Sequence, residues 1–173
     1  MFIGACISKR VGDEKNNIVL IGPVNSGKSS VFNRLLGFER AIVSDIPGTT
    51  RDAIEDTIII EGIKYRFVDT AGLRKTDDEI ESKGIEITKS KISLASVLIY
   101  LFDINDSSEQ EIIADLSEFY REDLSIILVR NKVDLKNESS IKIESLLKKC
   151  EAYGINNILE ISAIQKKYLD IIK

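Results

Sequence analysis

The residues with the clearest chemical potential are residues 22–29, which read GPVNSGKS. They fit the pattern G-x-x-x-x-G-K-[ST] between an apolar run and a segment with helical spacing, the context of a phosphate-binding loop. Glycines let main-chain N–H groups surround a phosphate, and the N-terminus of the following helix adds positive potential. Lys28 can reach the β- and γ-phosphate oxygens, and Ser29 can ligate Mg²⁺. The residues expected to contact a nucleotide here are Asn25, Ser26, Gly27, Lys28, Ser29 and Ser30.

A second polar group, NKVD at residues 131–134, closes another apolar run. The Asp134 carboxylate can accept hydrogen bonds from N1–H and the N2 amine of guanine, a donor pair that adenine lacks. Leaving a buried carboxylate unmatched costs about 1–3 kcal/mol or more, so such a site selects its base. Asn131 and Lys132 are expected to brace the loop and to pack on the base. NKVD by itself is also compatible with an ordinary strand end.

The short string ISA at residues 161–163 strengthens the guanine interpretation, because it follows the next predicted strand. A main-chain N–H near Ala163 can bind guanine O6, and Ser162 stands beside it. Together NKVD and ISA predict the two sides of a guanine pocket.

Two further motifs supply oxygen ligands for a metal ion. DTAG at residues 69–72 ends a predicted strand, so that Asp69 can hold Mg²⁺ through water and the Gly72 N–H can bind a γ-phosphate. DIPGTTRD at residues 45–52 supplies two hydroxyl groups. One of Thr49 and Thr50 is expected to ligate Mg²⁺, and Thr50 is favoured, although each threonine is also compatible with a solvated turn.

The hydrophobic pattern predicts the strands that position these motifs. Short apolar runs at residues 17–22, 96–103, 125–134 and 157–162 are typical of buried strands. Residues 56–69 predict two strands joined by a tight turn at Glu61 and Gly62.

Helices are predicted between these strands. The first begins near Gly27, ends at Gly37 and places an apolar face inward, formed by Val31, Phe32, Leu35 and Leu36. Helical spacing resumes after residue 84, a capping box of Ser108 and Glu111 opens a helix toward Tyr120, and residues 141–153 and 164–172 complete the set. The alternation indicates an α/β fold, a three-layer sandwich whose mostly parallel six-stranded sheet has one antiparallel edge strand.

Composition limits the class of protein. The 173 residues are 43% hydrophobic and 30% charged, with a net charge of -4. No apolar run approaches the ~20 residues of a membrane span. The sequence has no dense Lys/Arg block, so general electrostatic binding to nucleic acid or membrane is not expected. There is no histidine, which removes the commonest general base, and the two cysteines, Cys6 and Cys150, lack metal-ligand spacing. A reduced, cytoplasmic protein is expected.

Taken in their order along the chain, the five motifs are identified as those of a P-loop GTPase, over residues from about 18 to 163. GPVNSGKSSVFNRLL, AIVSDIPGTTRD, FVDTAGLRKTDDEIESKGIEI and NKVDL are similar to the G domain of the MnmE (TrmE) family, the GTPases of bacterial and organellar tRNA wobble-uridine modification. The resemblance implies an enzyme that hydrolyses GTP. A Der- or Era-like ribosome-assembly GTPase is the alternative family. Der shares GTTRD and DTAG but usually has basic residues where this chain has Asp77, Asp78, Glu79 and Glu81.

The resemblance also implies residue roles and cofactors. Leu73 follows DTAG where many GTPases place a water-holding glutamine, and in the MnmE family a glutamate matching Glu81 acts instead. A K⁺ ion beside the phosphates, with Asn25 as a ligand, takes the place of an arginine finger, because a fixed cation stabilises charge on the transferred phosphoryl group. Lys28 and Thr50 are the other expected catalytic residues. Without the resemblance, Glu81 would be a solvated acid and Asn25 a loop residue bonding its own backbone.

The resemblance further implies partners and boundaries. Residues 1–17 are interpreted as a flexible tail or a remnant of a neighbouring segment, and residues 18–173 as the G domain. The expected direct partners are GTP or GDP and a second copy of the domain, which meets the first across the nucleotide-sensing switch segments. A tRNA-modification partner protein and tRNA are expected to bind only through folate-binding and helical domains that are missing from this chain. No membrane is expected as a partner. Val24 replaces a common proline, and IQKKYLDII follows SA where a glycine-containing loop is usual. An excised G domain or a reduced relative is expected, and a nucleotide-gated binding module with negligible turnover is the second functional hypothesis.

Overall fold

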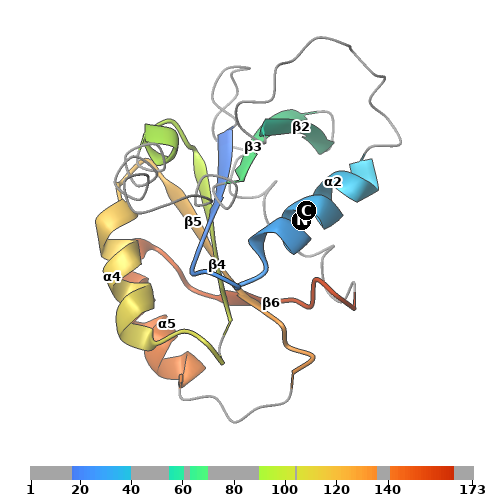
Figure 1. The fold of residues 1–173 in the computed structure, drawn as a ribbon. Helices are drawn as coiled ribbons and strands as arrows, with labels where there is room; N and C mark the ends of the chain where they lie inside the picture. Colours follow the sequence, from blue (N-terminus) through green and yellow to red (C-terminus); the bar gives the residue numbers. More distant parts are fainter. Residues whose placement is uncertain are drawn as a thin grey trace, which may run out of the picture.

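The computed structural model describes residues 17–39, 55–60, 63–69, 90–103, 105–135 and 141–165. These residues form three layers, in which helices cover both faces of one twisted sheet (Figure 1). The predicted α/β fold with a largely parallel sheet is therefore confirmed. Of the predicted tail at residues 1–17, residues 1–16 lie outside the described residues, and Asn17 belongs instead to the first strand.

The sheet has six strands in the order β2-β3-β1-β4-β5-β6. Their bounds are β1 (Asn17–Ile21), β2 (Glu55–Ile60), β3 (Ile63–Asp69), β4 (Val97–Asp103), β5 (Ser125–Asn131) and β6 (Ile158–Glu160). β3, β1, β4, β5 and β6 run parallel to one another, and β2 pairs antiparallel with β3 at the edge. The two residues of the predicted tight turn between β2 and β3 lie outside the described part of the chain.

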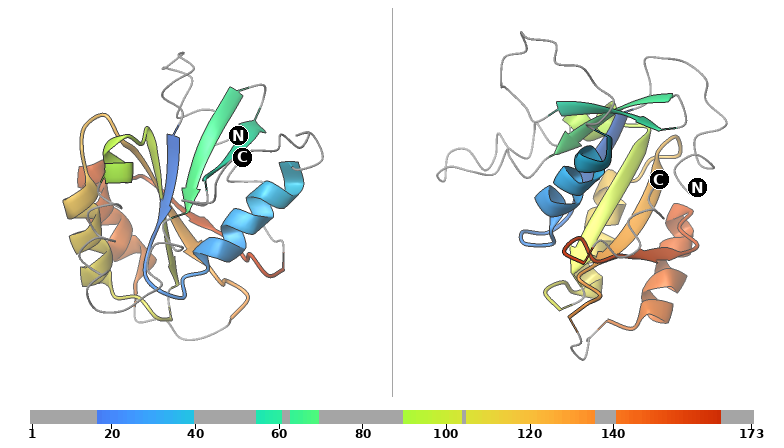
Figure 2. Two further views of the ribbon diagram at one scale, coloured as in Figure 1. Left: turned by 45° about the horizontal axis from the view of Figure 1, so that its top comes forward. Right: turned by 90° about the vertical axis from the view of Figure 1, so that its right-hand side faces the viewer.

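The helices divide between the two faces of the sheet. Figure 2 shows α2 (Lys28–Glu39) on one face, with α4 (Glu109–Phe119) and α5 (Ile143–Cys150) on the other. A short 3₁₀ helix, η2 (Glu151–Tyr153), extends α5. The predicted capping box is confirmed: Ser108 is the N-cap of α4, and its hydroxyl accepts from the Glu111 N–H while the Glu111 carboxylate accepts from the Ser108 N–H. Two otherwise unpaired helix-end donors are satisfied in this way.

Each face of the sheet carries its own core, because side chains alternate along a strand. In β1, Ile18 and Leu20 pack with the apolar face of α2, formed by Val31, Phe32 and Leu35. Val19 and Ile21 instead join the buried residues beneath α4 and α5. Every residue of β4 is buried, as expected for a central parallel strand covered on both sides.

Some predicted boundaries differ from the observed ones. The first helix is predicted to end at Gly37 but continues to Glu39, because a glycine costs only about 1 kcal/mol in a helix and does not by itself end one. The last strand is shorter than predicted, and the α5 region begins two residues later. Ile164 and Gln165, predicted to open a final helix, lie in a turn, and the rest of that prediction falls outside the described residues.

The topology determines where a ligand can bind. The chain leaves β1 for β2 and β3 on one side and then crosses to β4, β5 and β6 on the other. In open α/β sheets, ligands bind outside the carboxyl ends of the strands where the strand order reverses. The predicted phosphate loop follows the carboxyl end of β1, next to that of β4. None of the described helices is long and apolar enough to cross a membrane.

Candidate functional site

Residues 22–27 form the turn between β1 and α2, and two glycines make this turn possible. Gly22 has a φ of 144°, and a Cβ atom there would lie 1.9 Å from the Leu101 carbonyl oxygen. Gly27 has a φ of 94°, and a Cβ atom would lie 2.3 Å from Asn131 Nδ2. Both positions combine a positive φ with close approach of another strand's end, so only glycine fits without displacement. The loop therefore packs closely against Leu101 of β4 and Asn131 of β5.

Lys28 lies across this loop. Its Nζ donates to the Gly22 carbonyl at 2.9 Å and to the Pro23 carbonyl at 2.5 Å, and the residue is 7% exposed. The ammonium is therefore held over the turn, at the start of α2, where the helix dipole adds positive potential. This arrangement favours an anion bound by the loop.

The remaining residues of the loop differ in exposure. Asn25 at the tip is exposed and left-handed, with a φ of 63°. Ser29 and Ser30 are exposed in the first turn of α2. Ser26 is buried, and within the described part of the chain its Oγ has no hydrogen-bond partner. Asn25, Ser29 and Ser30 are thus accessible to a ligand, and their contacts with a nucleotide or a metal ion stay predictions.

Asn131 joins the phosphate loop to the predicted guanine pocket. It is 2% exposed, its Nδ2 donates to the Ser26 carbonyl at 2.9 Å, and its Oδ1 accepts from the Ala163 N–H at 3.1 Å. One buried amide therefore fixes the loops after β1, β5 and β6 relative to one another. The Ala163 N–H, expected at guanine O6, is engaged with Asn131 in this structure, so its bond to a base stays a prediction. Ser162, also expected here, is buried and accepts from the Gln165 N–H.

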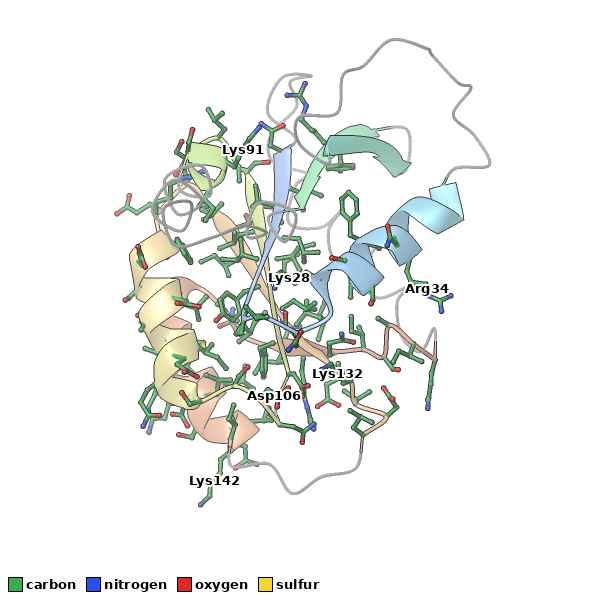
Figure 3. The ribbon with its side chains drawn as sticks, in the orientation of Figure 1. Lys28, Arg34, Lys91, Asp106, Lys132 and Lys142 are labelled. Atoms are coloured by element: carbon green, nitrogen blue, oxygen red, sulfur yellow. The ribbon has the colours of Figure 1, made fainter. Side chains whose placement is uncertain are left out.

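Lys132 and Asp134 follow Asn131 at the carboxyl end of β5. Lys132 has a φ of 61°, and its Nζ lies 2.8 Å from Asp103 Oδ2. Asp134 is partly buried, and its Oδ1 has no hydrogen-bond partner among the described residues. A buried carboxylate oxygen without a donor is suited to a ligand that brings N–H groups. Lys28 and Lys132 lie toward the same end of the sheet, and Lys91 lies at the opposite end (Figure 3).

Asp103 belongs to the site, although none of the sequence motifs includes it. It is 2% exposed at the end of β4, directly beside Asn131 of β5. Burial alone would raise its pKa, but hydrogen bonds from Lys132 and Asn105 and the Lys132 charge lower the pKa below the ordinary value of 3.8. The available signal was an aspartate closing a fully apolar strand, at the sheet edge where ligands bind.

Part of the predicted site falls outside the residues that the structure describes. Thr49, Thr50, Gly72 and Glu81 lie outside the described residues. The backbone places Asp69 at the end of β3, where it pairs with Leu20 of β1 just before the phosphate loop. Ser29 lies in the first turn of α2, after the loop that follows β1, and Asp69 ends the neighbouring strand β3. Both side chains carry oxygen ligands of the kind that Mg²⁺ prefers.

Comparison with known sequences gives a consistent group of relatives. A family model described as 50S ribosome-binding GTPase matches residues 17–132. The tRNA modification GTPase MnmE of Cytophaga hutchinsonii is 48% identical over 129 residues, covering 73% of this chain and 28% of that protein. The MnmE of Bacteroides thetaiotaomicron is 44% identical over 156 residues, covering 88% and 33%. The chain thus spans about a third of the length of these relatives.

Solved structures with the same fold include two of Era. A structure of Era with MgGDPNP and nucleotides 1506-1542 of 16S ribosomal RNA has a TM-score of 0.65 and 25% identity, covering 91% of this chain and 54% of that one. A variant of Aquifex aeolicus Era bound to GDP.AlF4- has a TM-score of 0.61 and 24% identity, covering 90% and 54%. The likeness to the second structure concerns the fold alone.

Proposed function

This chain belongs to the 50S ribosome-binding GTPase family, and from that premise we propose that it is the G domain of an MnmE-like tRNA-modification GTPase. The observation that carries the proposal is the buried Asn131 amide, which joins a phosphate loop to a guanine-type pocket. The identity of 42–48% to MnmE proteins over 70–88% of the chain supports this choice of subfamily.

We propose that GTP lies with its phosphates on the loop of residues 22–29 and its base beside Asp134. Lys28 exchanges the Gly22 and Pro23 carbonyls for β- and γ-phosphate oxygens, since a phosphate offers a charged acceptor in place of two neutral ones. The open Asp134 Oδ1 accepts from the guanine base. The Gly72 N–H binds the γ-phosphate.

We assign each proposed metal ion to residues that carry suitable ligands. Ser29, Thr50 and Asp69 are the proposed Mg²⁺ ligands, and exposed Asn25 is the proposed K⁺ ligand. Both ions, when bound, supply positive charge near the phosphoryl group that is transferred. Glu81 positions the attacking water, with Lys28 and Thr50 completing the catalytic set. Two G domains meet across their switches in the GTP state.

The wider role follows the relatives and is likewise a proposal. The MnmE proteins are named as tRNA modification GTPases, so we propose that this domain couples GTP hydrolysis to that process, in the cytoplasm, together with folate-binding and helical domains. tRNA and a modification partner are contacted through those other domains. The likeness to Era supports a ribosome-assembly role as the second candidate. A second G domain encoded beside this one would favour a Der-like protein, and a folate-binding domain would favour MnmE.

Phosphate release under multiple turnover tests the proposed function. The chain is assayed with GTP and with ATP, each in KCl and in NaCl, at micromolar protein so that weak dimers can form. The proposal expects turnover of GTP only, faster in KCl. Equal rates in both salts would contradict the K⁺ site and the dimer that depends on it. Tight GTP binding without turnover would instead indicate a nucleotide-gated binding module.

A further inference from the structure

The buried Asp103 forms an ion pair with the guanine-motif lysine, and this pair has a consequence for base selection. Asp103 Oδ2 lies 2.8 Å from Lys132 Nζ, and its Oδ1 accepts from the Asn105 N–H at 3.0 Å and from Asn105 Nδ2 at 3.1 Å. The Asp103 carbonyl accepts from the N–H groups of Asp106 and Ser107. The Asp103 carboxylate is thus held in place by Asn105 of its own loop, independently of its ion pair with Lys132.

Two acids are neighbours of Lys132, one across the sheet and one along the chain. Asp103 faces it across the ends of β4 and β5, and Asp134 stands two residues further along the chain. A lysine ammonium carries three donors and pairs readily with any nearby carboxylate. The structure shows the ammonium on Asp103, while Asp134 Oδ1 keeps no hydrogen-bond partner among the described residues.

We propose that Asp103 is a positioning residue for guanine recognition, which holds the Lys132 ammonium so that Asp134 stays open to the N1–H and N2 amine of the base. The inference rests on the proposed guanine-nucleotide function. Asp103 does not touch the base itself. It acts through Lys132 in two ways: it directs the lysine stem along one path, and it prevents an internal ion pair that would occupy Asp134.

Ionisation of Asp103 is maintained under ordinary conditions, which the role requires. Hydrogen bonds from Lys132 and Asn105 and the Lys132 charge outweigh burial and keep its pKa below the ordinary value. The left-handed backbone at Lys132, with a φ of 61°, fixes the direction in which the side chain leaves the strand end. Geometry and charge therefore select one partner for the lysine.

The test compares the affinities of GDP and IDP, because inosine lacks the N2 amine that Asp134 reads. Asp103→Asn keeps the shape of the side chain but releases the Lys132 ammonium. The GDP-to-IDP affinity ratio is expected to fall about tenfold, since one charged hydrogen bond to the base is lost. Asp106→Asn is the matched control, because it removes an exposed acid from the same loop and should leave the ratio unchanged.

A double variant separates positioning from general damage. In Asp103→Asn combined with Lys132→Met, no ammonium remains to occupy Asp134, so the GDP-to-IDP ratio is expected to recover toward the parent value. A purely structural role predicts weaker binding of both nucleotides with no change in the ratio, and that result would overturn the proposal. A low ratio that persists in the double variant would overturn it as well.

Two further measurements keep the outcomes distinct. If the parent chain shows no preference for GDP over ADP, the proposed function fails, whereas an unchanged ratio in Asp103→Asn with a guanine-selective parent contradicts only the positioning role. Melting curves establish that each variant is folded. If Asp103→Asn does not fold, Asp103→Ser replaces it: the carboxylate is removed and a small polar side chain remains, so a reduced ratio supports the proposal while a parental ratio contradicts it.

Discussion

The two halves of the candidate site are built in different ways. The phosphate half depends on backbone: Gly22 and Gly27 adopt positive φ angles, and neither has room for a Cβ atom. The guanine half depends on side chains, with the Asn131 amide and the Asp103–Lys132 ion pair arranged around Asp134. In the proposed function, the phosphate half recognises charge and shape through main-chain N–H groups, and the guanine half recognises a base through particular side chains.

This difference predicts that substitutions in the two halves have different effects on folding and on nucleotide binding. A substitution in the phosphate half alters the path of the chain itself, so it should damage folding and binding together. A substitution in the guanine half leaves the chain path intact, so it should change which nucleotide is bound. Asn131 is the exception, because its amide contacts the loops of both halves and its loss should combine the two effects.

The largest expected effect is a change of base preference on Asp134→Asn. An asparagine presents a donor where guanine requires an acceptor, while xanthine offers a carbonyl oxygen at the matching position. The preference for GTP over XTP should shift by roughly 10⁴-fold, the scale on which hydrogen-bonding sites reject mismatched groups. Competition binding with labelled GDP and XDP measures this shift, and Asp106→Asn serves as an exposed control. An unchanged preference would place base recognition elsewhere.

A second prediction concerns chemistry that neither half supplies. Glu81→Ala should keep GTP and GDP affinities within a few-fold but reduce kcat by roughly 10²–10⁴, the range for a positioned acid–base group. Leu73 has no hydrogen-bonding group to take over the water. Glu79→Ala, in the same acidic run, is the matched control and should retain the parent rate. Loss of nucleotide binding in Glu81→Ala would indicate a structural role instead.

The phosphate half is tested by a single methyl group. Gly22→Ala places a Cβ atom 1.9 Å from the Leu101 carbonyl oxygen, which is backbone of the central strand β4 and cannot rotate away. Backbone strain and overpacking together should lower the free energy of unfolding by about 4 kcal/mol. Gly154→Ala is the control, because Gly154 has a φ of 73° but no atom within 4 Å of the added Cβ. Chemical denaturation should show a loss of only about 1 kcal/mol there.

Sequence reasoning predicts the local features of this protein well. The apolar strands, the phosphate loop and the Ser108–Glu111 capping box each depend on residues within a few positions of one another, so their patterns suffice. The pair of Asp103 and Lys132 depends instead on the register of β4 against β5, which no local pattern contains. The left-handed backbone at Lys132 is likewise set by the turn after β5, not by the preference of a lysine.

The smallest expected effect is the part of the acid dependence of stability that comes from Asp103, in the guanine half. The pKa of Asp103 lies below 3.8 in the folded protein, so its ionised form contributes stability that is complete above that pH and is lost as the pH falls through the folded pKa. At pH 7, Asp103→Asn should lower the free energy of unfolding by about 2 kcal/mol, because it removes a charged hydrogen bond. Urea denaturation of both proteins between about pH 7 and pH 3 should show this difference constant down to about pH 4 and shrinking below it. A difference that stays constant to the lowest pH would mean that the Asp103 charge contributes nothing, and that the variant acts through packing alone.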